Sequence, residues 1–274
     1  NPLVSVVMTS YNRSKLINRA ILSVITQSYQ NWELIIVDDA STDDTPIILK
    51  EWVDKEKRIK VIMNKKNLWQ QYGLSPNLNN GVNLSRGKYI ARLDDDDYWI
   101  DKDKIKKQVE FLENNLDYVV CGGGAIVEDA SGKDIFKYLK NEKDEEIRKR
   151  ILFANPFTNT TTVFLKTAFD KVGGYGDWRY AEDWDLWLKL GALGKFYNFQ
   201  EYFTRYLMAG QSKSFIHQRP QSKMILEIIE KYKKTYPNFW KAYLLNVIQY
   251  IYSFLPLFLR KWLHPLLSSF KRSI

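Results

Sequence analysis

Four short apolar runs, separated by helix-like patterns, constrain the fold of this chain more than any other feature of its sequence. The runs are rich in Val, Ile and Leu and are typical of buried strands; they cover residues 3–9, 32–37, 59–63 and 88–93. Apolar residues at helical spacing fill the intervals between them. Alternating strands and helices predict an α/β fold in which a mostly parallel sheet is flanked by helices.

Polar side chains follow three of these four runs, at the point where each predicted strand ends. The polar segments are residues 9–12 (TSYN), Asp38-Asp39 and the run Asp94 to Asp97. Ligands of open parallel sheets bind outside the carboxyl ends of the strands. The three segments therefore predict one shared ligand site.

Length and cysteine content narrow the class of protein. The 274 residues suffice for one α/β domain with an appendage. A single cysteine, Cys121, and two histidines exclude a disulfide framework and a Cys/His zinc cluster. The chain opens on a strand pattern rather than on a signal peptide, so we expect a cytoplasmic protein in a reducing compartment.

The net charge of +9 is concentrated at one end of the chain. Residues 231–274 contain eight Lys or Arg and no Asp or Glu, whereas the rest of the chain is close to neutral. A near-neutral body is not typical of a nucleic-acid-binding domain, so we expect no nucleic-acid partner.

Residues 221–274 predict a helical tail that is both basic and apolar. Residues 221–235 have the spacing of an amphipathic helix, and residues 242–259 carry no charge. A membrane span takes about 20 apolar residues, and this stretch includes Asn246 and Pro256. We expect residues 231–274 to lie on an anionic membrane surface, peripheral on the inner face of the cell membrane. A packed core helix, an oligomer interface and a true span are the alternatives.

The run Asp94 to Asp97 is the strongest chemical signal. Adjacent carboxylates repel one another unless a cation or a hydrogen-bond network compensates them. Mg²⁺ and Mn²⁺ take carboxylate oxygens, and Mg²⁺ commonly joins one or two of them to substrate phosphates. The alternative is a solvated acidic loop that caps the next helix. The position of the run, directly after an apolar strand, favours a metal site.

Two further acidic pairs allow two interpretations each. Asp38-Asp39 can accept hydrogen bonds from a ribose or a base, or can form an Asx turn and a helix cap. Glu182-Asp183 can supply a general base, or can cap the helix that starts there. Asp185 is an acid in the interior of that helix, and we expect it to be structural.

Other chemistries lack their motifs. The sequence contains no P-loop, no G-x-G-x-x-G fingerprint and no G-x-S-x-G elbow. Gly122-Gly123-Gly124 predicts a bulge or a close backbone approach. His217 and His264 are isolated in the sequence. We expect His217 to be structural or exposed, and a position near the ligand site is the less expected alternative.

Four segments in order carry a resemblance to a known family. They are PLVSVVMTSYNR at 2–13, WELIIVDDASTDDT at 32–45, RGKYIARLDDDDYW at 86–99 and GGYGDWRYAEDWDLWLKL at 173–190. Together they resemble the family 2 glycosyltransferases, over about residues 2–215. The resemblance implies the GT-A fold and transfer of a sugar from a nucleotide-sugar donor.

The resemblance also implies roles for individual residues. Thr9, Tyr11 and Asn12 would lie at the nucleotide, and Asp39 would read the ring N–H of uracil or thymine. Asp94 and Asp95 would lie near the ribose and the donor sugar, and Asp96 would hold a divalent metal, Mn²⁺ or Mg²⁺, on the diphosphate. Asp183 matches the catalytic base of the family, and its neighbour Glu182 is counted with the substrate-binding residues. The metal-binding motif of the family is D-x-D. Here Asp95 occupies the x position and Asp97 follows the motif, so the metal ligand is assigned to within one position of Asp96.

These observations predict an inverting, metal-dependent glycosyltransferase that uses a UDP- or dTDP-sugar, of the hexosyl- or N-acetylhexosaminyltransferase class. Residues 1–220 would form the catalytic domain, with a nucleotide-binding half (1–100) and an acceptor half (101–220), followed by the tail 221–274. The tail suggests a lipid-linked or surface-polysaccharide acceptor and permits oligomer contacts. A sugar-nucleotide nucleotidyltransferase is one rival, although it should show a Gly-rich basic loop where this chain has Tyr11-Asn12-Arg13. A non-catalytic membrane-surface module is the other.

Overall fold

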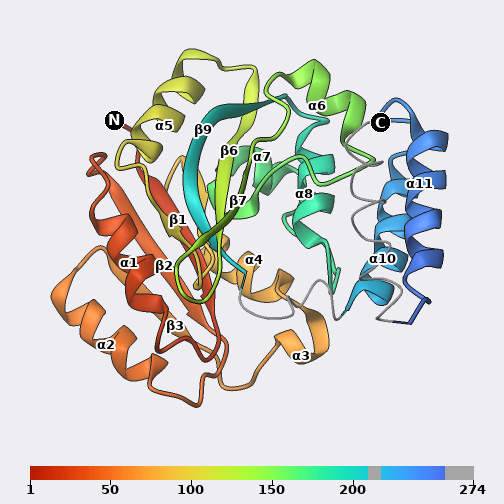
Figure 1. The fold of residues 1–274 in the computed structure, drawn as a ribbon. Helices are drawn as coiled ribbons and strands as arrows, with labels where there is room; N and C mark the ends of the chain where they lie inside the picture. The colour runs from red at the N-terminus through yellow and green to blue at the C-terminus, as the bar shows by residue number, and fades with distance from the viewer. Residues whose placement is uncertain (209–216, 257–274) are drawn as a thin grey trace.

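The computed structural model describes residues 1–208 and 217–256. Its first part alternates strands and helices as the sequence predicts (Figure 1). In chain order these elements are β1 (Val4–Ser10), α1 (Ile17–Ile25), β2 (Trp32–Asp38), α2 (Thr45–Lys55), β3 (Ile59–Met63), α3 (Trp69–Tyr72), α4 (Ser75–Asn83) and β4 (Tyr89–Arg92).

The second part is more mixed, and it ends in two helices. Its elements are β5 (Tyr98–Trp99), α5 (Lys104–Asn114), β6 (Tyr118–Glu128), β7 (Asp134–Tyr138), α6 (Asp144–Arg150), a 3₁₀ turn (Asn159–Thr161), β8 (Val163–Leu165), α7 (Lys166–Lys171), α8 (Glu182–Leu190), β9 (Lys195–Leu207), α10 (Gln218–Lys231) and α11 (Phe239–Tyr252).

One sheet organises the molecule. Its strand order is β3-β2-β1-β4-β8-β6-β9-β5, with β7 paired to β6. The strands β3, β2, β1 and β4 are mutually parallel, and β9 runs parallel to β6. β8, β7 and β5 join antiparallel. The predicted α/β class with a mostly parallel, helix-flanked sheet is confirmed.

The central strands are buried on both faces, which explains their continuous apolar sequences. Every residue of β1 and β2 is buried. Along β1, Val6 and Met8 pack with α1, α2 and α5 on one face, whereas Val7 packs with α4, α8 and the C-terminal helices on the other. The alternation of side chains along a strand thus divides the apolar residues between two cores.

Three parts of the second half are not evident from the sequence pattern. Residues 128–150 are rich in charge; β7 is exposed, but α6 buries Ile147 in the core. Within residues 155–165 the only strand is β8, which has three residues. The long strand β9 was not predicted, because its polar residues interrupt the apolar pattern; it pairs with β6, about 75 residues earlier in the chain.

The glycine triplet at 122–124 lies where β6 meets β9, and the register of the two strands shifts there. A Cβ on Gly123 would come within 2.4 Å of the Phe203 ring. The predicted bulge and close approach are therefore both present, since only glycine leaves room for that ring.

The helices α10 and α11 pack against the body of the protein, side by side beyond α6 and α8 (Figure 1). Ile228 and Ile229 of α10 and Leu245 of α11 belong to the same apolar cluster as α8. The Tyr232 hydroxyl donates a 2.9 Å hydrogen bond to Asp185, which confirms a structural role for that acid. None of the helices in residues 1–208 and 217–256 is long and apolar enough to cross a membrane. The predicted segment 242–259 ends outside the described residues.

Candidate active site

The polar ends of β1, β2 and β4 converge on a cavity of about 510 Å³, which the segment before α8 and the helix α10 complete. All of the predicted site residues except Asn12 line this cavity: Thr9, Tyr11, Asp39, Asp94, Asp95, Asp96, Glu182 and Asp183. The convergence follows from the parallel register, which brings the carboxyl ends of neighbouring strands to the same edge of the sheet.

The loop after β1 is held by hydrogen bonds to its neighbours. The Tyr11 amide donates to Asp95 at 3.2 Å, which ties the loop to the aspartate run. Asn12 turns away from the cavity: its side-chain oxygen accepts the Thr42 amide at 2.8 Å, and its backbone adopts a φ of 53°. The geometry thus assigns Asn12 a place in the loop framework rather than in the cavity lining.

The two acids after β2 have different surroundings. Asp38 accepts bonds from the Ser41 amide and hydroxyl, which is the Asx-turn arrangement that the sequence allowed. Asp39 lines the cavity and accepts the amides of Leu68 and Trp69, at 2.9 and 3.0 Å. The Asx turn therefore belongs to Asp38, and Asp39 is the member of the pair that lines the cavity.

Each of the first three acids of the aspartate run lies beside an arginine. Arg92, a fully buried residue of β4, contacts Asp94 at 2.8 Å and also donates to the Val7 carbonyl. Arg13 contacts both Asp95 and Asp96 at 3.3 Å. Two guanidinium groups thus face three carboxylates, which leaves the run with an excess of negative charge.

Two of the three acids have raised pKa values, and burial is the main cause. Burial, reinforced by Asp96 and opposed by Arg13, raises the pKa of Asp95 to about 7. Burial also raises the pKa of Asp94, although Arg92 opposes the shift. Carboxylates held together against their own repulsion favour a bound cation. Carboxylate oxygens are the donors that Mg²⁺ and Mn²⁺ take, so the run fits such an ion with phosphate oxygens completing the shell. Among residues 1–208 and 217–256, no group of three acid, His or Cys side chains converges as a metal site.

Asp97 has a different environment from the other three acids. It does not line the cavity; it is buried, and one of its oxygens accepts the Leu207 amide at 3.3 Å. Burial, together with Asp94 and Asp96, raises its pKa well above the ordinary value. Asp97 is therefore a buried acid of the framework at the end of the run, and its surroundings favour the protonated form.

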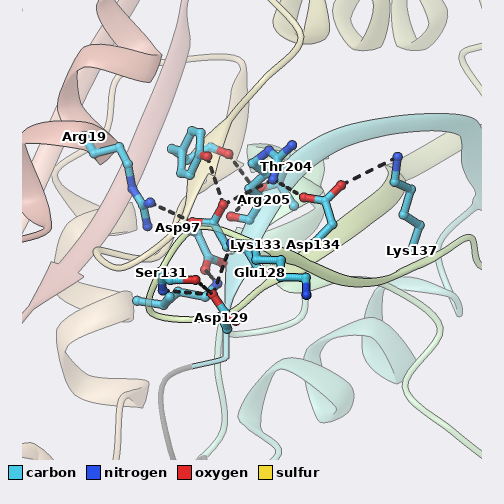
Figure 2. A network of polar contacts seen from close by, with 12 residues as sticks. Arg19, Asp97, Glu128, Asp129, Ser131, Lys133, Asp134, Lys137, Thr204 and Arg205 are labelled. Atoms are coloured by element: carbon cyan, nitrogen blue, oxygen red, sulfur yellow. Dashed lines mark hydrogen bonds and ion pairs between the residues drawn. The ribbon is translucent and has the colours of Figure 1, made fainter.

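A polar network around the buried Glu128 lies next to Asp97, at the end of the aspartate run (Figure 2). Glu128, at the end of β6, accepts Arg19 at 2.7 Å, Arg205 at 3.3 Å and the Tyr98 hydroxyl at 3.0 Å. Arg19 in turn donates to the backbone carbonyl of Asp96 at 3.0 Å. Arg19 and Tyr98 therefore connect Glu128 to the Asp96 carbonyl and to the strand that follows the turn.

Glu182 and Asp183 begin α8 and face the same cavity from the opposite part of the chain. Asp183 accepts the Asn155 side-chain amide at 2.7 Å and the Trp184 backbone amide at 2.8 Å. Burial raises the pKa of Asp183, and these two donors oppose the shift. Burial and the neighbouring Asp183 raise the pKa of Glu182 to about 8. Neither acid has an ion pair within the described part of the chain.

Several buried polar atoms without partners belong to residues that line the cavity. Among the described residues, Ser10 Oγ, Asn77 Nδ2, Asn159 Oδ1 and Arg179 Nε are buried without a hydrogen bond, and all four residues line it. Buried polar groups in native proteins are nearly always satisfied. The lining is therefore built to bind a polar ligand.

Backbone strain concentrates in the same place. Besides Asn12, Ala40 and Ala181 hold positive φ values of 62° and 58°, beside Asp39 and Glu182. Non-glycine residues adopt such angles at a cost of about 1–3 kcal/mol, and they cluster at functional sites.

Sequence reasoning missed several of the residues that line the cavity. Arg13, Arg179 and Tyr180 lie inside the segments that carry the family resemblance, so their position was a usable signal. Asn155 had no comparable signal. His217, for which a site position was the less expected alternative, stacks on Tyr180 with ring centroids 5.5 Å apart, at the margin of the cavity.

The chain is similar to known glycosyltransferases. Residues 5–173 match the family model described as glycosyl transferase family 2. The chain is 35% identical over 244 residues to an uncharacterised glycosyltransferase of Haemophilus influenzae, covering 83% of this chain and 72% of that protein. It is 38% identical to the putative glycosyltransferase EpsE of Bacillus subtilis, covering 73% and 71%.

A shorter match and two solved structures add detail. The shorter match is to the Escherichia coli enzyme WfgD, a UDP-Glc:alpha-D-GlcNAc-diphosphoundecaprenol beta-1,3-glucosyltransferase, with 37% identity, 43% of this chain and 44% of that protein. The structure of S. aureus TarS residues 1–349 in complex with UDP-GlcNAc has a TM-score of 0.68 and 17% identity to this chain. The match covers 91% of this chain and 72% of that chain. The mannosyltransferase PcManGT of Pyrobaculum calidifontis, in complex with GDP-Man and Mn²⁺, has a TM-score of 0.66 and 17% identity. The match covers 98% of this chain and 74% of that chain.

The solved structures establish the fold, which is that of the GT-A glycosyltransferases. The family model and the relatives go further, because they cover most of the chain at substantial identity. The chain belongs to glycosyl transferase family 2.

Proposed function

We propose that this glycosyltransferase transfers a sugar from a UDP- or dTDP-sugar to an acceptor hydroxyl, with inversion and with a divalent metal. The observation that carries the proposal is the placement of two acidic groups on one cavity. Asp94, Asp95 and Asp96 lie at the end of β4, and Asp183 lies at the start of α8. The first group suits a cation on a diphosphate, and Asp183 suits a proton acceptor.

The chain's own residues account for the proton transfer and its geometry. Asp183 takes the proton of the acceptor hydroxyl as the new bond forms at the anomeric carbon and the bond to the diphosphate breaks. Asn155 holds the Asp183 carboxylate through its 2.7 Å hydrogen bond. A single direct displacement inverts the anomeric carbon and requires no second nucleophilic carboxylate. When bound, Mn²⁺ or Mg²⁺ held by Asp96 would supply Lewis-acid charge on the leaving diphosphate.

The donor and the acceptor classes are inferred from the site and from the relatives. Asp39 lines the cavity next to Trp69, where a base N–H would find a carboxylate acceptor. The name of WfgD includes a UDP-sugar donor and a diphosphoundecaprenol acceptor, and TarS is described in complex with a UDP-sugar. We therefore infer a hexosyl or N-acetylhexosaminyl donor and a lipid-linked or surface-polysaccharide acceptor.

The C-terminal helices support a position at a membrane surface. Large apolar side chains recur along one exposed stripe of α11: Trp240, Leu244, Ile248 and Ile251. Lys233, Lys234 and Lys241 lie nearby in the sequence, and residues 231–256 contain no acid. An apolar stripe among basic residues is suited to the interface of an anionic bilayer. We propose that residues 221–274 hold the catalytic body, residues 1–220, peripherally on the inner face of the cell membrane.

A thermal-shift panel of nucleotides and nucleotide sugars, with and without Mn²⁺, tests the donor assignment. UDP, dTDP or their sugars should raise the melting temperature most, and Mn²⁺ should increase that shift. D39A should weaken the binding of the base-containing ligands more than it slows transfer. A preference for nucleoside triphosphates with release of pyrophosphate would instead favour a nucleotidyltransferase, and binding without donor hydrolysis or transfer would favour a non-catalytic module.

Vesicle sedimentation of the full chain tests the membrane assignment. Leu244 and Ile47, on α11 and α2, are both apolar and both 61% exposed, so they form a matched pair. L244E should lower sedimentation with anionic vesicles, whereas I47E should behave as the unchanged protein. High salt should weaken binding only in part, because the apolar contribution remains. If the unchanged protein ignores anionic vesicles while L244E alters its oligomeric state, α11 is an interface between copies.

A further inference from the structure

The cavity contains more acidic than basic groups. Its ionisable lining comprises six carboxylates and two arginines: Asp39, Asp94, Asp95, Asp96, Glu182, Asp183, Arg13 and Arg179. A substrate that carries phosphate groups needs positive charge in such a cavity, from a metal or from a side chain. The state of the two arginines therefore decides which of them can meet a phosphate.

Arg13 is already engaged. Its guanidinium contacts Asp95 and Asp96, each at 3.3 Å, and the group belongs to the framework of the aspartate run. Arg179 has no ion pair with any described residue, and its Nε is buried without a hydrogen-bond partner. Arg179 is thus the cavity arginine whose charge is uncommitted within residues 1–208 and 217–256.

Arg179 is nevertheless held in place. Its backbone lies so close to Gly73 that a Cβ there would come within 2.5 Å of the Arg179 carbonyl oxygen. Its guanidinium lies 5.8 Å from the ring centroids of both Trp69 and Tyr180, within the range of a cation–π contact. An arginine that lines a polar cavity, is oriented by aromatic rings and has no hydrogen-bond partner at its Nε is suited to bidentate binding of a phosphate.

We infer that Arg179 binds a phosphate group of the substrate. The inference rests on the proposed function, because it assigns a second anionic contact to the same cavity. Trp69 links Arg179 to Asp39, since the Trp69 amide donates to the Asp39 carboxylate at 3.0 Å. The phosphate can belong to the nucleoside diphosphate of the donor or to a phosphate-linked lipid acceptor, and the two share the same chemistry at Arg179.

Three variants of the full chain test the inference. R179M removes the charge and keeps much of the length, and R179K keeps the charge but loses the planar fork. R86M is the matched control, because Arg86 pairs with Glu33 away from the cavity. Calorimetry with Mn²⁺ measures the affinities for UDP and uridine, and for inorganic pyrophosphate with and without saturating UDP. Melting curves identify any variant that fails to fold, in which case R179K carries the test.

The expected loss for R179M is about 10- to 100-fold in the affinity for one phosphate probe, with R179K intermediate and R86M unchanged. A loss for UDP without a loss for uridine assigns Arg179 to the donor diphosphate. Unchanged UDP binding with weaker pyrophosphate binding assigns it to the acceptor phosphate. Equal losses for UDP and uridine, or unchanged affinity for UDP and pyrophosphate, would overturn the inference. Absence of UDP binding by the unchanged protein would count against the donor assignment, whereas the pyrophosphate comparison would still decide the role of Arg179.

Discussion

The two acidic groups on the cavity differ in how the protein treats their charge. The first three acids of the aspartate run lie against arginines, with Arg92 at 2.8 Å from Asp94 and Arg13 at 3.3 Å from Asp95 and Asp96. Asp183 receives only neutral amide donors, from Asn155 and Trp184. The run thus combines its carboxylates with positive partners, whereas Asp183 has none, although burial raises the pKa of both Asp95 and Asp183. Under the proposed function, this contrast corresponds to an electrostatic role for the run and a proton-transfer role for Asp183.

The change expected to have the largest effect is D183N. The amide keeps the volume but cannot take a proton at neutral pH, so transfer should fall by about 10²–10⁴-fold. Donor binding and the melting temperature should change little. Both are measured on the same sample, because Asp183 also lies in the first turn of α8, where an acid stabilises the helix. If D183N retains activity but melts at a lower temperature, Asp183 stabilises the start of α8 instead of taking a proton. The proposed difference in role between Asp183 and the aspartate run would then be wrong.

The second prediction concerns the aspartate run. D96A should lower transfer by roughly 10²-fold or more and remove the effect of Mn²⁺ on UDP affinity, because the metal contributes several kcal/mol to stabilising the leaving diphosphate. D97N is the matched control: Asp97 is buried, and its pKa lies well above the ordinary value, so an amide resembles its neutral form. Metal titrations of UDP binding compare the two variants. If Mn²⁺ still raises UDP affinity in D96A but no longer does so in D97N, the metal ligand is Asp97 rather than Asp96.

The third prediction tests the support behind the run. E128Q should weaken the response to Mn²⁺ and lower transfer by about tenfold, because Arg19 would lose the partner that holds it against the Asp96 carbonyl. Uridine affinity should stay the same. D134N is the control, since Asp134 also pairs with Arg205 but lies at the surface. Equal effects of E128Q and D134N on the metal response would show that the network stabilises the fold without positioning the run.

The smallest expected effect is a pH dependence of stability at Glu182. Its pKa is about 8 in the folded protein against an ordinary value of 4.5. The folded state therefore holds this proton more tightly, so the stability from this group is complete below about pH 4.5 and is lost as the pH rises through 8. E182Q should remove that loss and melt about 2–4 °C higher than the unchanged protein at pH 9, if the gain is about 1 kcal/mol.

The same pH series gives the control for E182Q. At pH 4.5 the two proteins should melt together, and E51Q, on the exposed surface of α2, should follow the unchanged protein throughout. A constant offset between E182Q and the unchanged protein at every pH would mean that the carboxyl contributes packing rather than a titrating charge.

The sequence predicted the four N-terminal strands and the acids at their ends because these signals are local. A run such as Val4–Ser10 is continuously apolar since both of its faces are buried, and the polar residues follow where the strand leaves the sheet. The strand β9 had no such signal. It is recognisable only beside β6, whose register and glycine triplet accommodate its aromatic side chains.

The order of the motifs, the fold class and the identity of the candidate acids therefore follow from the sequence alone. The tertiary structure decided which of these acids has a cation beside it, that Asn12 turns away from the cavity, and that α11 buries one face and exposes the other. It also placed Arg179 beside Trp69, 110 residues earlier in the chain. The physical reason is that charge and burial depend on neighbours in space, and at this site those neighbours come from segments far apart in the chain.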